Sequence, residues 1–488
     1  MSTYNRVVAA DSTASLAPTV RARLATEMAD PTSEVGASLS GTFMRALRKV
    51  SDLTYPVVLA HKGGANLAPE DTVEAFRSAL AYGAQVLDLD VVALLDGTAV
   101  VIHDSTLDRT TNVSGNVSDQ TAMSWSNLTV DSASWFGGSF GNLHPPLLTD
   151  VLKEFGGKVV LQIEAKTAGT AAALARDVVR YGVEDSVILS TAFWAAIPDL
   201  VASGAHTRFV MSTGVEKTPT EVAVAGCSGI DVVHNAAAMT EALIGDFHTA
   251  GLTVFGYTPD RQADVAVWVA KGGDGWYSDD PVYSAGIQNG YSYRLSKMPF
   301  TSQTYYHGHI PGSANIRGVF TPPDGWGISD TVNLGARTNL AGGICPIKGD
   351  PDADTFTIDF TIKIESMVDT GRWAGFYVGF DSDDQFNDGA TDVGRNGYRC
   401  LINGGGSVEI AKYTDGVSVG NVATASSTAL SLPATITGKV TVSPTQVILQ
   451  RTDVAATATA NDATYRGGYV HFGMSGVTAR FTRFEVTA

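Results

Sequence analysis

The sequence predicts a parallel α/β barrel of the TIM type, followed by an all-β sandwich and preceded by a short helical arm. Two observations carry this prediction. As far as Ser284, short β-branched segments alternate with helical segments, which is typical of a parallel sheet covered by helices. From Gly290 onward, alternating apolar and polar residues lie between Gly- and Asp-rich turns, which is typical of antiparallel sandwiches.

The N-terminal arm, residues 1–52, is polar and rich in Ala, Ser and Thr. We expect two short helices in it, at Ala17–Met28 and Ser40–Val50, with a Pro31-Thr32-Ser33 break between them. Because so short a segment buries little apolar surface, the arm is expected to serve docking or oligomerisation.

The predicted barrel spans residues 53–288 and has nine strand candidates for eight places, so one candidate either is not a strand or lies outside the ring. Arg208–Met211 and Val232–His234 are the most open to exclusion. Residues 108–146 interrupt the alternation and are interpreted as an insertion. The other strand candidates are Pro56–His61, Val86–Val91, Ala99–His103, Lys158–Glu164, Ser186–Ser190, Thr253–Tyr257 and Gly275–Ser278, and the helix candidates are Thr72–Tyr82, Thr170–Tyr181, Ala238–Ala250 and Ala263–Lys271.

The sandwich, residues 289–488, resembles the concanavalin-like jelly rolls at the level of fold. A domain of this texture binds carbohydrate or builds an assembly, although fold alone does not decide which. Its predicted strands are Thr355–Ile364, Trp373–Phe380, Gly397–Ile402, Ser407–Tyr413, Gly438–Val442, Gln446–Gln450, Tyr469–Met474 and Thr478–Val486.

Composition excludes several classes of protein. The formal net charge of −17 argues against a protein whose main task is to coat nucleic acid, since phosphate binding needs excess cations. We find no apolar run of about 18 residues and no secretory signal, so neither a membrane span nor secretion by that route is expected. Cys227, Cys345 and Cys400 are expected to be small buried hydrophobic residues, with a Cys345–Cys400 bond as the alternative.

Polar residues follow four of the apolar strand candidates. In a parallel barrel the carboxyl ends of the strands meet at one mouth, where catalytic residues lie. We therefore expect two imidazoles, several carboxylates and two ammonium groups to converge there. These residues are His61, Lys62, Asp88, Asp90, His103, Glu164 and Lys166.

This set of groups suits phosphodiester chemistry. Asp88 and Asp90 are two residues apart, so on a strand both side chains point to the same face. Neighbouring carboxylates favour a hard divalent cation with oxygen ligands, and such a cation polarises a phosphoryl oxygen. Two histidines can donate and accept protons near neutral pH, while lysines neutralise charge on phosphate oxygens.

These residues lie in a series of short motifs that resembles the glycerophosphodiester phosphodiesterase family over roughly half of the chain, as judged from motif order. Each motif alone is weak, but six occur in the family's order. They are His61-Lys62-Gly63, Pro69-Glu70-Asp71-Thr72, Asp88-Leu89-Asp90-Val91, Asp96-Gly97 with His103-Asp104, Leu107-Asp108-Arg109-Thr110-Thr111 and Glu164-Ala165-Lys166, and the later Tyr257-Thr258 and Ser278-Asp279-Asp280-Pro281 resemble the family's closing strands.

The resemblance implies a barrel enzyme that binds Ca²⁺ or Mg²⁺ and cleaves glycerol phosphodiesters through a cyclic phosphate. It leaves open which histidine is the acid. The implied roles are acid and base for His61 and His103, metal ligands for Asp88, Asp90 and Glu164, a ligand or neighbour for Glu70, catalytic phosphate contacts for Lys62 and Lys166, and substrate binding for Arg109 and Tyr257.

Three positions depart from the family's usual residues: Lys62 replaces Arg, Asp88 replaces Glu, and Tyr257 replaces Trp. Lysine lacks the planar fork that holds phosphate in two places, and the shorter Asp88 can shift the metal. None of the three changes removes an acid, a base or a charge. We therefore expect an active enzyme, with a degraded binding-only site as the alternative.

Other residues near the motifs can be interpreted as structural as well as functional residues. Asp104 either orients His103 or caps a turn, and Arg109 either anchors its loop or contacts phosphate. Asp279 and Asp280 are expected to be turn or barrel-closing residues. The acidic segment at residues 381–388 is interpreted as a plain turn, because it lacks the central glycine of an EF-hand calcium loop.

The Ala29–Ala37 stretch resembles the start of tail-associated proteins of bacteriophages that infect actinobacteria. This resemblance implies a homotrimeric tail enzyme, bound to other tail proteins of the virion, that degrades a glycerol-phosphate polymer such as teichoic acid. The alternatives are an inert receptor-binding protein, a cytoplasmic enzyme for small lipid-headgroup diesters, and a phospholipase D-like toxin, against which the motif at residues 69–72 counts.

Overall fold

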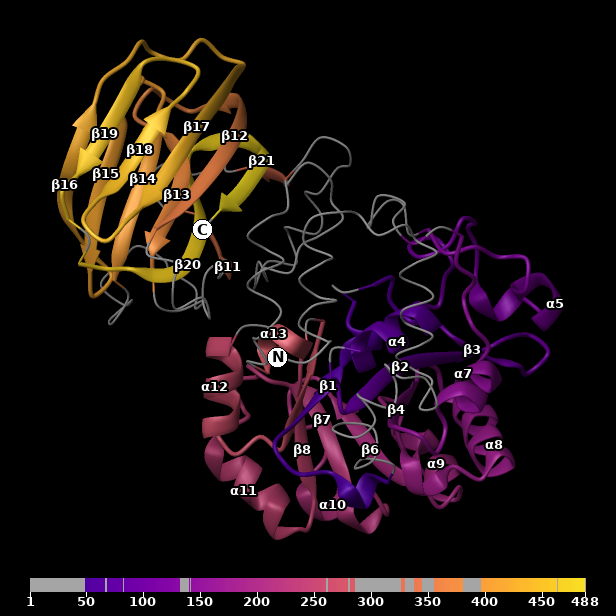
Figure 1. The fold of residues 1–488 in the computed structure, drawn as a ribbon. Helices are drawn as coiled ribbons and strands as arrows, with labels where there is room; N and C mark the ends of the chain where they lie inside the picture. The colour runs from indigo at the N-terminus through magenta and orange to yellow at the C-terminus, as the bar shows by residue number, and fades with distance from the viewer. Residues whose placement is uncertain are drawn as a thin grey trace, which may run out of the picture. The chain divides into compact units, whose positions relative to one another are not determined.

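The structure is a computed structural model, and its described residues fall into an α/β unit, which holds almost all of them up to residue 285, and an all-β unit (Figure 1). Residues 1–48 of the predicted arm, the acidic segment at 381–388, Cys345 and Asp280 lie outside the described residues. The described ranges are 49–65, 68–81, 83–131, 140, 142–259, 262–279, 281–285, 326–329, 338–344, 355–380, 396–462 and 464–487.

The α/β unit is a closed barrel of eight parallel strands, which confirms the predicted TIM-type architecture. The ring closes because β1 pairs in parallel with both β2 and β9. In chain order the strands are β1 (Val57–Ala60), β2 (Val86–Ala93), β4 (Val160–Ala165), β5 (Val187–Thr191), β6 (His206–Met211), β7 (Gly229–Val233), β8 (Thr253–Tyr257) and β9 (Gly275–Ser278).

The ninth strand candidate, now β3 (Ala99–Val101), lies outside the ring and pairs antiparallel with the end of β2. The two candidates most open to exclusion, within β6 and β7, are both barrel strands. The expectation that His103 follows a barrel strand was therefore wrong. The reason is local: β2 continues past the ring and reverses through a tight turn, closed by a Leu94 N–H to Thr98 carbonyl bond of 2.8 Å.

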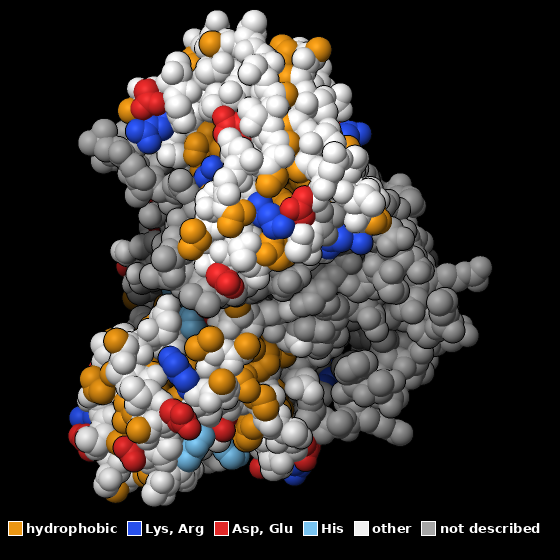
Figure 2. Space-filling view, turned by 90° about the vertical axis from the view of Figure 1, so that its left-hand side faces the viewer, with side chains coloured by type: hydrophobic (Ala, Val, Ile, Leu, Met, Phe, Trp, Pro, Cys, Tyr) orange, Lys and Arg blue, Asp and Glu red, His pale blue; other side chains and the backbone are white. Residues whose placement is uncertain are grey.

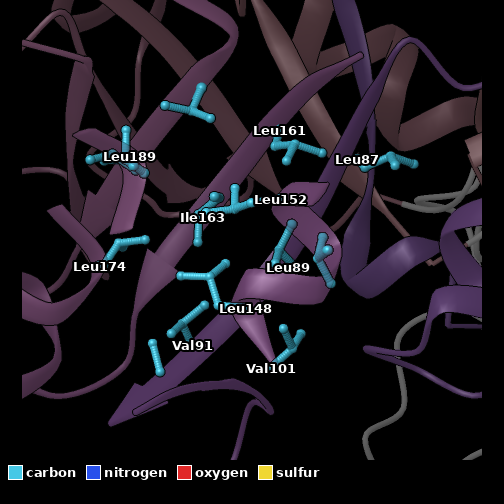
Figure 3. Packing of buried hydrophobic residues seen from close by; sticks show 14 of the residues in the cluster. Leu87, Leu89, Val91, Val101, Leu148, Leu152, Leu161, Ile163, Leu174 and Leu189 are labelled. Atoms are coloured by element: carbon cyan, nitrogen blue, oxygen red, sulfur yellow. The ribbon is translucent and has the colours of Figure 1, made fainter. Parts of the chain in front are cut away.

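Apolar side chains of the strands and the surrounding helices form the layer between barrel and helices (Figure 3). Leu87, Leu89 and Val91 of β2 face this layer, so the alternate residues of the strand face the barrel interior. Helix α7 (Leu148–Phe155) adds Leu148, which is fully buried. Burying each such side chain stabilises the fold by about 1.5–3 kcal/mol.

The four predicted helices are confirmed within one to three residues at each end, whereas several short helices were not predicted. The confirmed ones are α4 (Val73–Ala81), α8 (Ala171–Tyr181), α11 (Glu241–Thr249) and α12 (Gln262–Ala270). The others are α5 (Ala122–Trp125), α7, α9 (Ile197–Val201), α10 (Pro219–Val224) and α13 (Pro281–Ser284), with the single turns η2 (Val50–Asp52), η3 (His61–Gly63), η4 (Val117–Asp119), η5 (Ala168–Thr170), η6 (Glu184–Ser186) and η7 (Trp194–Ala196).

The predicted insertion carries a small core of its own, built on the β2–β3 hairpin. Trp125 is almost fully buried there and donates its indole N–H to the Pro145 carbonyl at 2.9 Å. Leu94, Leu107 and Val117 pack in the same cluster. The hairpin and the insertion therefore stabilise each other beside the barrel.

The second unit consists of two six-stranded antiparallel sheets, so its all-β class is confirmed while jelly-roll connectivity stays a prediction. In the upper part of Figure 2 its surface shows mainly backbone and side chains that are neither hydrophobic nor charged, with scattered hydrophobic and charged side chains among them. The first sheet contains β10 (Trp326–Ser329), β12 (Phe356–Met367), β17 (Ala434–Val442), β18 (Val447–Arg451), β19 (Ala456–Ala460) and β21 (Val477–Thr487), and the second contains β11 (Thr338–Ile344), β13 (Trp373–Gly379), β14 (Gly397–Asn403), β15 (Val408–Thr414), β16 (Val417–Ala425) and β20 (Gly467–Ser475).

Two expectations about side chains and helices have outcomes here. Cys227 and Cys400 are buried free thiols, as predicted, and the alternative of a bond between Cys400 and Cys345 is therefore wrong. In the part of the chain that the structure describes, every helix is too short or too polar to cross a membrane.

Candidate active site

The first group of site residues follows β1 in the single turn η3. Lys62 has a left-handed backbone, with φ of 52°, and its N–H donates to a carboxylate oxygen of Asp88 at 3.2 Å. Gly63 also has positive φ, and a Cβ there would lie 2.7 Å from the Cβ of Ala75. Only glycine allows α4 to pack this closely against the turn, which fixes the position of His61.

His61 forms a close pair with Asp279, at 2.7 Å between Nδ1 and Oδ1. Asp279 directly follows β9, the strand beside β1 in the ring, so the closure of the barrel brings the pair together. A histidine with a carboxylate at Nδ1 presents Nε2 for proton transfer, since the carboxylate fixes the tautomer and the ring orientation. The interpretation of Asp279 as a turn or barrel-closing residue did not include this contact. Its position directly after the strand beside β1 could have indicated that it lies near His61.

His103 forms a similar pair with Asp104, at 2.7 Å between Nδ1 and Oδ1. It reaches the mouth because the Ile102 N–H donates to the Asp90 carbonyl at 2.9 Å, at the end of β3. The other oxygen of Asp104 accepts from Nε of Arg109 at 2.6 Å. Asp104 thus orients His103, which decides between its two predicted readings.

Arg109 also forms a two-pronged ion pair with Glu70, at 2.7 and 2.8 Å. Glu70 in addition lies 3.4 Å from Nζ of Lys62. The Arg109 guanidinium is therefore engaged by two carboxylates, as its loop-anchor reading predicts. Its contact with phosphate, and metal binding by Glu70, stay predictions.

The predicted metal ligands lie together on adjacent strands. Asp88 and Asp90 point from β2 into the barrel, as expected, and Asp90 is level with Glu164 of β4. Lys166, just past β4, lies 3.1 Å from a Glu164 oxygen and 3.7 Å from Oδ1 of Asp90. Asp88 and Asp90 are each only 3% exposed. Three carboxylates and an ammonium group therefore share one small volume.

Electrostatics places both histidines around this volume. Burial acts to raise the pKa of Asp90, but the positive charges of Lys166, His103, Lys62 and His61 together lower it. Both imidazoles are thus close enough to the same carboxylate to influence its ionisation. This is the convergence that the sequence predicted for the barrel mouth.

Several groups near Asp90 have shifted pKa values. Burial, assisted by the charge of Asp90, raises the pKa of Glu164 to about 7. Burial lowers the pKa of His103 below its usual value, although the neighbouring Asp90 opposes that shift. The neutral imidazole of His103 is therefore the favoured form at neutral pH.

Tyr257 ends β8 on the same rim and is half-buried. Its hydroxyl donates to the Met211 carbonyl at 2.9 Å. Burial raises its pKa, and the charge of Glu164 contributes in the same direction, so the phenol lies near the carboxylate cluster. The ring is placed to form a wall of the site, while its contact with substrate stays a prediction.

The donor chemistry of the cluster fits a hard divalent cation. Its seven carboxyl groups outnumber its three permanent cations, and Oδ2 of Asp71 and Oδ2 of Asp90 are buried without a hydrogen-bond partner. Among the described residues, no three His, Cys, Asp or Glu side chains are already gathered at metal-ligand spacing. The carboxyl groups are Glu70, Asp71, Asp88, Asp90, Asp104, Glu164 and Asp279, and the cations are Lys62, Arg109 and Lys166.

Comparison with known proteins identifies the barrel. Residues 61–282 match the glycerophosphoryl diester phosphodiesterase family. A glycerophosphodiester phosphodiesterase of Caldanaerobacter subterraneus is 29% identical over 243 residues, which cover 46% of this chain and 94% of the relative. The uncharacterized protein YqiK of Bacillus subtilis is 30% identical over 242 residues, covering 47% of this chain and 97% of the relative.

A crystal structure of a glycerophosphodiester phosphodiesterase from Agrobacterium tumefaciens is 28% identical in sequence, with a TM-score of 0.42, and covers 47% of this chain and 99% of its own. The family match falls on the barrel unit, and each of these relatives covers less than half of the chain. Through residues 61–282 the chain belongs to the glycerophosphoryl diester phosphodiesterase family and is an enzyme of the phosphoric diester hydrolase class.

Proposed function

We propose that the barrel hydrolyses glycerol phosphodiesters by proton transfer between two histidines, with the help of a divalent cation. The observation that carries this proposal is that His61 and His103 each contact a carboxylate at 2.7 Å. Both imidazoles also lie near the buried Asp90 carboxylate, which they approach from different segments of the chain. Two oriented imidazoles are what a reaction needs if one alcohol must lose a proton and another must gain one.

We assign the base to His103 and the acid to His61. The lowered pKa of His103 supports this order, since its favoured neutral form can accept a proton. In the first step, His103 removes the proton of the glycerol hydroxyl next to the phosphate. That oxygen attacks phosphorus, His61 protonates the departing alcohol, and a cyclic phosphate forms. In the second step, water opens the ring with the histidine roles reversed.

The lysines stabilise charge on the phosphate. The ammonium groups of Lys62 and Lys166 lie among the carboxylates of the mouth, where they can meet the equatorial phosphate oxygens. Asp88, Asp90 and Glu164 would hold the cation, with Glu70 beside them. A bound divalent cation supplies positive charge that polarises a phosphoryl oxygen.

Turnover of glycerophosphocholine, followed as release of glycerol phosphate, tests this assignment. We expect His61→Ala and His103→Ala each to lower kcat by about 10²–10⁴-fold. We also expect EDTA to abolish turnover, and Ca²⁺ or Mg²⁺ to restore it. Near-wild-type turnover by either variant removes that histidine from the mechanism, and unchanged activity in EDTA removes the cation.

We further propose that the natural substrate is a glycerol-phosphate polymer of a bacterial wall, such as teichoic acid, and that the protein works in a bacteriophage tail as a homotrimer. The support is the resemblance of Ala29–Ala37 together with a separate all-β unit, which a hydrolase of small diesters does not need. That unit is proposed to bind carbohydrate or to join the tail.

Competing substrates distinguish this proposal from its alternatives. We expect a higher kcat/KM for poly(glycerol phosphate) than for glycerophosphocholine, with shortened polymer as the product. A preference for the small diester indicates a cellular lipid-headgroup enzyme. Binding to wall polymer without any hydrolysis indicates an inert receptor-binding protein.

A further inference from the structure

Asp71 is a buried acid at the barrel mouth to which the proposed mechanism gives no role. It is only 5% exposed, and its Oδ2 has no hydrogen-bond partner. Leaving a carboxylate oxygen buried and unpaired is unfavourable unless a cation or a proton meets it. The unpaired oxygen therefore marks a place that a cation or a proton has to fill.

Backbone contacts fix Asp71 against the proposed metal ligands. Its own N–H donates to the Lys62 carbonyl at 2.9 Å, while the Lys62 N–H donates to Asp88. Oδ1 of Asp71 accepts the Asp90 N–H at 3.3 Å. Asp71 is thus bound to the backbone of Asp90 and, through Lys62, is held near the Asp88 carboxylate.

The second unpaired oxygen of the cluster belongs to Asp90. Oδ1 of Asp90 faces Lys166 at 3.7 Å, whereas its Oδ2 is buried without a partner. Asp71 and Asp90 are also close enough for each charge to influence the other carboxyl group. Two neighbouring acids with one unpaired oxygen each provide the kind of ligands that a hard divalent cation takes.

A cavity gives this position room. It is small, with a volume of about 10 Å³, and its lining combines Glu70, Asp71 and His103 with Thr110, Thr111 and the apolar side chains of Val101, Ile102, Val130 and Pro145. Asp71 therefore borders a small space beside His103. This space is about large enough for one ion or one water molecule.

We propose that Asp71 is a ligand of the divalent cation, so that the metal site comprises Asp71 as well as Asp88, Asp90 and Glu164. This inference rests on the proposed metal-dependent function. A further carboxylate raises the negative charge of the site and strengthens cation binding, since ligand charge is one of the factors that set affinity.

Isothermal titration of CaCl₂ and of MgCl₂ into the cation-free full-length protein tests this inference without using turnover. Asp71→Asn keeps the amide oxygen for the Asp90 N–H and tolerates the left-handed φ of 55°. We expect it to weaken cation binding by about 10-fold or more, the effect known for groups around metal sites. Asp71→Gly, which adopts this φ freely, should behave in the same way.

Asp415→Asn is the matched control, because Asp415 also has a left-handed backbone, at φ of 48°, and lies in the other unit. It should bind cation as the wild type does. Thermal melts verify that each variant folds. The same Kd in Asp71→Asn, Asp71→Gly and wild type overturns the assignment of Asp71 alone. A wild type that binds neither cation overturns the metal site as a whole, while hydrolysis in EDTA would leave the phosphodiesterase proposal standing.

Discussion

Replacing Asp279 by Asn tests whether its contact with His61, at the end of β9, orients this histidine, to which we assign the role of proton donor. The Asp279 carboxylate lies 2.7 Å from Nδ1 of His61, and its side chain is only 11% exposed, so solvent screens the pair weakly. A hydrogen bond that involves a charged group contributes about 1.5–3 kcal/mol. If this contribution is realised mainly in the transition state, its loss lowers kcat by about 10- to 100-fold. KM should change little, since Asp279 has no proposed contact with substrate.

Asp274→Asn is the matched control for this variant. Asp274 also pairs with a histidine, His248, at 2.9 Å, but it precedes β9 and therefore lies at the opposite end of the barrel. Both variants are assayed for glycerophosphocholine turnover over a range of pH. We expect Asp274→Asn to retain wild-type kcat. Asp279→Asn with an unchanged kcat and an unchanged pH profile refutes the orienting role.

Four further predictions concern pH and stability. Burial lowers the pKa of His103, so the proposed base stays neutral at neutral pH. The value of kcat/KM should therefore stay constant as the pH is lowered to the ordinary histidine pKa of about 6.5 and fall only below it. A fall of kcat/KM with its midpoint above about pH 6.5 would contradict this. Because folding lowers the pKa of His103, protonation of this histidine favours the unfolded chain. The contribution of His103 to the free energy of unfolding should therefore decline as the pH falls below about 6.5. Arg208→Met leaves the buried Asp231 without its cationic partner and should lower the free energy of unfolding in urea by about 3–5 kcal/mol. The double variant Arg208→Met with Asp231→Leu should recover most of the loss, and equal losses in both proteins would refute this interpretation. Gly63→Ala should lower the thermal midpoint and destabilise the fold by about 1–3 kcal/mol, because the added Cβ meets Ala75 at 2.7 Å; a wild-type melt would show that α4 can move.

Much of the barrel could be predicted because its strands are short β-branched segments with polar residues at their ends. The place of β3 could not, since Ala99–His103 has the same texture as a barrel strand. Only pairing reveals its antiparallel direction, and pairing depends on how far β2 extends beyond the ring. Helix α7 was missed even though Leu148, Val151, Leu152 and Phe155 have helical spacing, because it directly follows the irregular insertion.

The site residues were predictable as a set but not as pairs. Polar strand ends predict which side chains meet at the mouth, because parallel strands end together. The partner of His61 comes from the far end of the barrel sequence, so only ring closure shows that Asp279 is adjacent. Asp71 was seen as part of a motif, but its unpaired oxygen depends on a left-handed backbone that the sequence pattern does not reveal.

The position of β3 outside the ring places the two histidines to which we assign proton transfer on separate parts of the unit. His61 belongs to the closed barrel, whereas His103 is carried by a hairpin whose small core is centred on Trp125. A fluctuation that opens only this appendage would withdraw one imidazole and leave the carboxylate floor intact. Such a protein would remain folded and would still bind phosphate, but it would be inactive until the hairpin closed again.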